Sequence, residues 1–178
     1  MDGVNKNMSK KIIKEIVSWI FVFAFAIIFA KALNKYVVVN VQPESGSMED
    51  TIQIGERVMT LRLAYTFSDP QRGDIVYFKP PFYTDKDYIK RILGLPGEVI
   101  EGRDGLVYIN GEPIEEDYVT EELRNDFGPY EVPEGKYFMM GDNRGSSFDS
   151  RGWTEKFVPR ENIHSKAVFR YPRFKWLY

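Results

Sequence analysis

A long apolar stretch near the start of the chain differs from everything that follows it. Residues 16–30 carry no charged side chain, and their aromatic side chains fall on all sides of a helix. These fifteen residues would span roughly 22 Å as a helix, whereas a hydrocarbon core is ~30 Å thick. Extended to Ile12–Leu33, the stretch spans roughly 33 Å. Because a helix packed on a soluble core keeps a polar face, the pattern predicts a transmembrane helix over residues 12–34.

The lysines around this stretch are unevenly distributed. Four lie within residues 1–15, whereas only Lys31 and Lys35 closely follow the stretch. Positive residues mark the cytoplasmic side of a membrane segment. We therefore expect residues 1–11 to form a cytoplasmic tail and residues 35–178 to form a domain on the outer side.

Three other interpretations of the stretch stay open. Ala30 and Ala32 are spaced like the small residues of a signal-peptide cleavage site, and a basic region precedes them. The stretch is then a signal peptide, or an anchor that the protein removes from itself after Ala32. The remaining interpretation is a core helix of a soluble protein, which the aromatic side chains around the helix disfavour.

After Asn34 the pattern changes to short β-branched and aromatic runs separated by Gly and Pro, which is typical of strands joined by turns. Asn110-Gly111 predicts a two-residue type I′ hairpin. Residues 97–135 are acidic and rich in turn signals, and we expect them to form an inserted β lobe or a long hairpin. No second long helical pattern occurs, so the body is predicted to be an all-β, partly open barrel or sandwich. The expected strands cover residues 36–41, 57–63, 74–78, 88–93, 106–110, 137–140 and 167–171.

Composition narrows the classes of function. The 178 residues are enough for one main domain, and the 43% hydrophobic share is enough for a core. With 24 basic and 26 acidic residues the net charge is −2, which argues against nucleic acid as a partner. The chain has no cysteine and one histidine, His164, so it has no disulfide and no thiolate or multi-histidine metal site. We expect neither a metal nor a cofactor, and a Ser-His-Asp triad would have to use His164.

Two short segments offer a nucleophile and a base. In Ser45-Gly46-Ser47, one serine on a tight turn is a candidate nucleophile, and the other is a candidate donor to an oxyanion; the alternative is an ordinary polar loop. Lys90 shares one face of an expected strand with Tyr88 and Ile92, whereas Arg91 points to the other face. A lysine with apolar neighbours is unusual because burying an ammonium is costly. An exposed edge-strand lysine that blocks aggregation would give the same pattern.

Two further segments are notable. Residues 72–78 lead from a turn into a buried strand and are interpreted as structural. Residues 141–151 contain two Asp, two Arg, one Asn and three Ser, which is typical of either a solvated loop or a hydrogen-bonded platform beside a site.

Together the four segments resemble type I signal peptidases, membrane-bound Ser–Lys peptidases that remove signal peptides from exported proteins. The family box S-M-x-P-T resembles residues 47–51, and R-G-D-[IV]-[IV]-x-F matches residues 72–78. The lysine box Y-[IV]-K-R-x-x-G-x-P-G-[DE] matches residues 88–98, and G-D-N-R-x-x-S-x-D-S-R matches residues 141–151. The short lobe and single anchor look most like the Gram-positive bacterial branch.

The resemblance implies a role for each matching residue. Ser47 matches the nucleophile and Lys90 the general base. The hydroxyl of Ser45 matches the group that forms the oxyanion hole with the Ser47 backbone N–H, and Ser147 matches the serine that orients the lysine. Charged residues that match the supports of the site are Arg91, Asp142, Arg144, Asp149 and Arg151, and the first two are expected to pair with each other.

The resemblance also implies a fold and partners. The expected fold is a coiled, mostly antiparallel β-sheet domain with one N-terminal transmembrane helix, lying against the outer surface of the cell membrane. Its expected partners are the signal peptides of exported preproteins and membrane lipid, and we expect a monomer. The peptide would bind as an extended strand, with small side chains at the first and third positions before the cut.

The chain departs from the family pattern at two positions, and two rival functions stay open. Asp50 and Glu44 stand where the family usually has proline, which puts the rigidity of the serine loop in doubt. An inactive membrane-tethered β module that only binds peptides would be expected to lack Ser47 or Lys90. A self-cleaving Ser–Lys repressor would need a DNA-binding helix-turn-helix, of which the sequence shows no sign.

Overall fold

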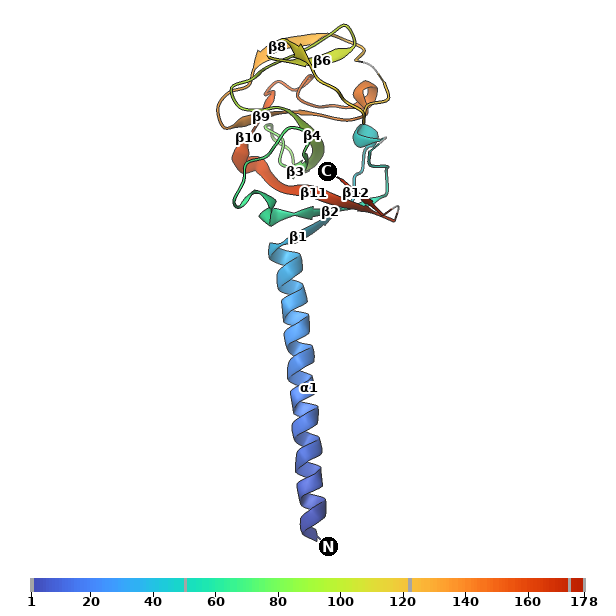
Figure 1. Ribbon diagram of the computed structural model, residues 1–178, viewed down its shortest axis with the longest axis vertical. Coiled ribbons are helices and arrows are strands. Elements are labelled where there is room, and N and C mark those ends of the chain that lie inside the picture. The colour runs from blue at the N-terminus through green and yellow to red at the C-terminus, as the bar shows by residue number, and fades with distance from the viewer. Residues whose placement is uncertain (1, 50, 122, 173, 178) are drawn as a thin grey trace. The chain divides into compact units, whose positions relative to one another are not determined.

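The computed structural model describes residues 2–49, 51–121, 123–172 and 174–177. Asp50, the residue at the family's proline position, lies outside the described residues. The chain forms two compact units, a helical unit of Met1–Val38 and a β unit of Val39–Tyr178 (Figure 1).

The helical unit consists of α1, Asp2–Tyr36. The segment Lys11–Tyr36 contains an 18-residue stretch with a mean hydropathy of 2.4, none of it buried, so by length and composition the segment can cross a membrane. The helix is longer than the predicted residues 12–34, since hydrogen bonding continues through the basic residues before the apolar stretch. It also takes in Tyr36, which was wrongly assigned to the first strand.

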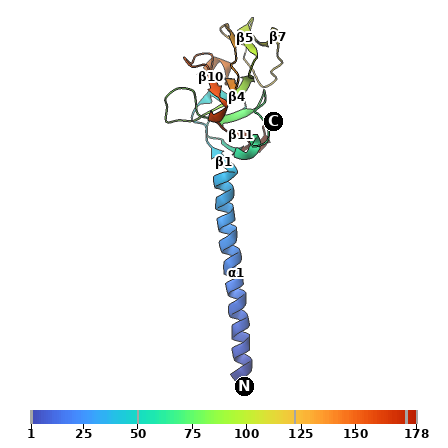
Figure 2. The ribbon, with the colours of Figure 1, turned by 90° about the vertical axis from the view of Figure 1, so that its left-hand side faces the viewer.

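The β unit is built on a curved main sheet with the order β1-β2-β11-β3-β4-β9-β10 (Figures 1 and 2). Neighbours from β2 to β10 are antiparallel, and β12 pairs with β11. Register shifts in β11 let this one strand pair first with β3 and then with β2, which bends the sheet as the predicted coiled fold requires. The bounds are β1 Val38–Val41, β2 Arg57–Leu61, β3 Ile75–Phe78, β4 Tyr88–Gly94, β9 Lys136–Met140, β10 Phe157–Pro159, β11 Ile163–Tyr171 and β12 Lys175–Trp176.

A second sheet, with the order β7-β6-β5-β8, falls within residues 97–135. The predicted two-residue hairpin is confirmed: Ile109 pairs with Glu112, and Asn110 and Gly111 have φ angles of 53° and 84°. In Figure 1 this sheet lies at the end of the β unit that is remote from β1. Its strands are β5 Val99–Arg103, β6 Leu106–Ile109, β7 Glu112–Pro113 and β8 Phe127–Glu131.

Strand β4 is buried on both faces, so the two charged residues that it carries, Lys90 and Arg91, are buried as well. Ile92 belongs to a core cluster with Phe78 and Trp153, whereas Leu93 belongs to a second cluster beneath the lobe. Lys90 and Arg91 are both buried. Adjacent side chains of a strand point to opposite faces, so these two charges lie on opposite sides of the sheet, as predicted.

Several strand predictions were wrong in extent. The strand predicted over residues 57–63 ends at Leu61, where a 3-10 turn, Arg62–Tyr65, begins. The strand predicted over residues 167–171 begins four residues earlier, at Ile163. Strands β5 and β8 were missed because each contains glycine, which is depleted in strands. In β5 the glycine is required, since a side chain at Gly102 would collide with the Phe127 ring.

Candidate active site

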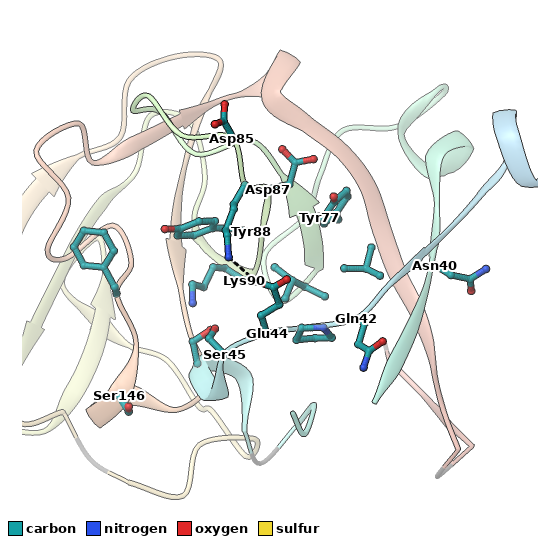
Figure 3. A pocket seen from close by; sticks show the side chains of 16 residues that line it. Asn40, Gln42, Glu44, Ser45, Tyr77, Asp85, Asp87, Tyr88, Lys90 and Ser146 are labelled. Carbon is teal, nitrogen blue, oxygen red and sulfur yellow. Dashed lines mark hydrogen bonds and ion pairs between the residues drawn. The ribbon is translucent and has the colours of Figure 1, made fainter. Parts of the chain in front are cut away.

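A cleft of about 690 Å³ opens on the β unit, and all four sequence segments contribute residues to its lining. Figure 3 shows Lys90 pointing toward the loop that carries Ser45. Tyr77 of residues 72–78 and Ser146 of residues 141–151 are among the lining residues. The lining residues are Asn40, Val41, Gln42, Pro43, Glu44, Ser45, Ser47, Tyr77, Asp85, Lys86, Asp87, Tyr88, Ile89, Lys90, Ser146 and Phe148.

Ser47 is held in a short 3-10 turn, Gly46–Met48. The side chain of Met48 is fully buried in a core cluster with Ile52, so the turn is anchored from below. Asn143 fixes it from the side: its backbone N–H donates to the Ser47 carbonyl at 3.2 Å, and its side-chain amide donates to the Gly46 carbonyl at 3.0 Å. The loop is therefore positioned without the family proline.

The hydroxyl groups of Ser45 and Ser47 lie 3.3 Å apart. Ser47 is largely buried but lines the cleft. A second hydroxyl and a backbone N–H next to a nucleophile are the donors that a developing oxyanion needs. The arrangement is suited to acyl transfer.

Lys90 lies in β4 with 3% of its surface exposed. The pKa of its ammonium is lowered from 10.5 to about 8: burial is the main cause and Arg151 contributes, whereas Asp149 and Asp142 oppose the shift. Within the described residues no carboxylate forms an ion pair with Lys90 and no hydrogen bond joins it to Ser47. Both residues nevertheless line the same cleft, and hydrogen bonds between catalytic groups are often long in substrate-free enzymes.

Asp142 connects the lysine strand to the serine turn. Its carboxylate accepts hydrogen bonds from Arg91 Nε at 2.8 Å and Arg91 Nη2 at 2.6 Å, as the resemblance implied. The Asp142 carboxylate also accepts a hydrogen bond from the Thr51 hydroxyl at 2.5 Å. Arg91 is tied further by a 2.8 Å hydrogen bond to the Gly73 carbonyl. One buried carboxylate thus joins three of the four sequence segments.

The remaining charged residues of segment 141–151 brace its own loop. Asp149 accepts two hydrogen bonds from the Arg151 guanidinium, both at 2.8 Å, one from the Arg151 backbone N–H at 3.3 Å and one from the Gly141 N–H at 3.0 Å. Burial would raise the pKa of Asp149, but these contacts hold it below its ordinary value. Arg144 donates to the Gly141 carbonyl at 3.1 Å and forms an ion pair outside the segment, with Glu116.

Ser147 does not show the contact that its predicted role requires. Its buried hydroxyl makes no hydrogen bond to Lys90 among the described residues; it interacts with Asp149, whose pKa it helps to lower, and it packs against Gly141, where any side chain would collide with it. The lysine-orienting role of Ser147 therefore stays a prediction.

Glu44, the second departure from the family pattern, has a visible partner. Lys86 donates to its carboxylate at 2.6 Å, and Figure 3 marks this ion pair at the cleft. Both side chains are largely exposed, so the pair is worth little stability. It joins two stretches of chain that line the cleft, residues 40–45 and 85–90.

Sequence reasoning missed three residues that contact the charged side chains of the site: Thr51 donates to Asp142, Glu116 pairs with Arg144, and the Tyr118 ring packs on Arg91. Thr51 belongs to residues 47–51, which resemble the family's nucleophile box, but the sequence suggested no function for its side chain. Glu116 and Tyr118 lie in the turn-rich lobe, where no pattern distinguishes them from solvated residues.

Comparisons with known proteins identify the family of the chain. Residues 16–173 match the family described as signal peptidase, peptidase S26. A probable signal peptidase I-2 of Synechocystis is 38% identical over 154 residues, covering 82% of this chain and 68% of the relative. Signal peptidase I S of Bacillus subtilis is 32% identical over 179 residues, covering 94% of this chain and 95% of the relative. The crystal structure of a signal peptidase I from Enterococcus faecalis covers 56% of this chain and 97% of its own, with 37% identity and a TM-score of 0.49.

These matches define the class of protein first: a serine endopeptidase with a mostly β domain and an apolar N-terminal helix, which is consistent with a single-pass membrane anchor. The chain belongs to the signal peptidase family, peptidase S26, whose members cleave signal peptides from preproteins.

Proposed function

We propose that the protein cleaves the signal peptides of preproteins with Ser47 as nucleophile and Lys90 as general base. The observation that carries the assignment is that both residues line one cleft, where burial lowers the pKa of Lys90 to about 8. At pH 7 such a lysine is neutral in about one molecule in eleven, against about one in 2,500 for a free lysine. Arginine offers no comparable base because it stays protonated in proteins. The single histidine, His164, does not line the cleft.

In the acylation step, neutral Lys90 accepts the proton of the Ser47 hydroxyl while the oxygen attacks the scissile carbonyl carbon. The oxyanion receives hydrogen bonds from the Ser45 hydroxyl and the Ser47 N–H. The protonated Lys90 then gives its proton to the leaving amine, and the signal peptide remains as an ester on Ser47. In deacylation Lys90 takes a proton from water, which attacks the ester, and the proton returns to Ser47.

The substrate is expected to lie as an extended strand beside residues 40–45, which border the cleft just before the nucleophile turn. Small side chains at the first and third positions before the cut would fit beside Ser45 and Ser47. The reaction as derived uses no metal and no cofactor, and we expect the protein to act as a monomer, without nucleic acid.

A direct test is to incubate the detergent-solubilised protein with a preprotein and to sequence the N-terminus of the product. We expect one cut, after a small residue, that neither chelators nor thiol reagents prevent, because the chain has no cysteine and only one histidine. The Ser47→Ala variant is the matched control. Binding of the preprotein without a cut would favour the inactive peptide-binding module instead.

For orientation, we propose that residues 1–11 face the cytoplasm, residues 12–34 span the membrane in contact with lipid, and residues 35–178 lie outside. Supporting this is the excess of lysine before the apolar stretch. Protease added to intact cells is expected to degrade the β unit and to spare an epitope on the N-terminal tail. Loss of the tail epitope alone would reverse the orientation, and mature protein beginning at Leu33 would show self-cleavage after Ala32.

A further inference from the structure

One loop of the lobe reaches back to two arginines that lie behind the site. Glu116 accepts hydrogen bonds from Arg144 Nη1 at 2.7 Å and Arg144 Nη2 at 2.6 Å. Tyr118 donates its hydroxyl to Glu116 at 2.6 Å, and its ring centroid lies 3.7 Å from the Arg91 guanidinium carbon. Two neighbouring lobe residues thus hold both arginines at once.

These contacts are sheltered from water. The side chains of Arg144 and Glu116 are 2% and 10% exposed, and that of Arg91 is 8% exposed. Bidentate charge-assisted hydrogen bonds fix geometry as well as contributing energy, and a cation–π contact strengthens when it is desolvated. An arrangement of this kind limits the movement of the groups that it holds.

Each arginine is connected to a proposed reacting group, either as its neighbour in the chain or through one intervening residue. Arg91 follows Lys90 in β4 and binds Asp142, which also accepts a hydrogen bond from Thr51 on the serine loop. Arg144 donates to the Gly141 carbonyl. Gly141 in turn packs so closely on the Ser47 carbonyl that a side chain there would collide with it.

We propose that Tyr118 and Glu116 are positioning residues, which act through Arg91 and Arg144 to hold the Ser47 turn and the Lys90 strand at the separation that proton transfer requires. The proposal rests on the assignment of Ser47 and Lys90 above. Neither lobe residue lines the cleft, so both act on the chemical step rather than on substrate binding.

The charges around Lys90 give the proposal a second readout. Asp142, Asp149 and Arg151 act on the Lys90 ammonium, and the Tyr88 ring lies 6.0 Å from it. When Arg91 is released, the negative charge of Asp142 is less compensated, and that charge raises the pKa of Lys90. Loosening the lobe loop therefore moves the rising limb of the pH–rate profile to higher pH.

The lobe itself supplies a matched control. Tyr108 stacks on Arg103 at the same 3.7 Å, but on an exposed face of the second sheet. We expect Tyr118→Leu, in the full-length protein, to lower kcat by ~10–100-fold, the scale of a misplaced catalytic group. KM should stay within about twofold, and the rising limb should move up. Tyr108→Leu should change none of these, and Tyr118→Phe, which keeps the ring on Arg91, should stay near wild type.

A second pair covers the case in which Tyr118→Leu does not fold. Glu116→Gln keeps the shape but removes the charge that binds Arg144, and Glu101→Gln removes a carboxylate from an exposed pair with Arg103 in the same lobe. We expect only the first to lower kcat at constant KM. A Tyr118→Leu or Glu116→Gln variant that matches its control, or a KM that changes as much as kcat, overturns the proposal. Activity retained by Ser47→Ala or Lys90→Arg would instead overturn the assignment on which it rests.

Discussion

Lys90→Arg is expected to lose cleavage completely, although it keeps the positive charge. Arginine cannot release its proton in a protein, so it cannot accept the proton of Ser47. Ser47→Ala should be equally inactive, and removal of a nucleophile or its base typically costs ~10⁴–10⁶ in rate. Ser45→Ala should cost less, ~10²–10³, because the Ser47 N–H remains as an oxyanion donor. The measurement is turnover of a preprotein by each purified variant, and near-normal turnover of Lys90→Arg would contradict the base assignment.

Two further variants separate this chemistry from folding. Lys86→Arg changes a lysine that lines the same cleft but is exposed, and it should retain activity. Lys90→Met should be inactive and yet at least as stable as wild type at pH 7. The folded protein binds the Lys90 proton less tightly than the unfolded chain, and the pKa shift from 10.5 to about 8 corresponds to about 3 kcal/mol. That cost applies fully below pH 8 and disappears as the pH rises past the unfolded pKa.

Local patterns predicted the parts of the site that depend on one strand or one turn. Alternation along β4 placed Lys90 and Arg91 on opposite faces, because a strand has a fixed period of two. Asn110-Gly111 predicted the hairpin, since both positions need positive φ angles and these residues adopt them. Such features need no knowledge of distant residues.

The parts that depend on distant packing could not be predicted in the same way. Tyr118 and Glu116 contact Arg91 and Arg144 only because the lobe folds back on the main sheet, and nothing in their own neighbourhood indicates it. Strand β8 carries Gly128 and a proline, so its local preference opposes a strand. Its pairing with β5 overrides that preference, and Gly128 lies so close to the Ile100 carbonyl that a side chain could not be accommodated.

The pH dependence of cleavage tests the mechanism as a whole. Only neutral Lys90 accepts the Ser47 proton, so kcat/KM should fall about tenfold for each pH unit below the pKa of the free enzyme. Because burial lowers that pKa to about 8, we expect the rising limb near pH 8 rather than above pH 10. The limb should be unchanged in His164→Ala, a variant of the single histidine, whose ring lies 3.8 Å from Asp87 and outside the cleft lining. A limb near ~6.5, the ordinary pKa of histidine, that disappears together with activity in His164→Ala would show that histidine, and not Lys90, is the base.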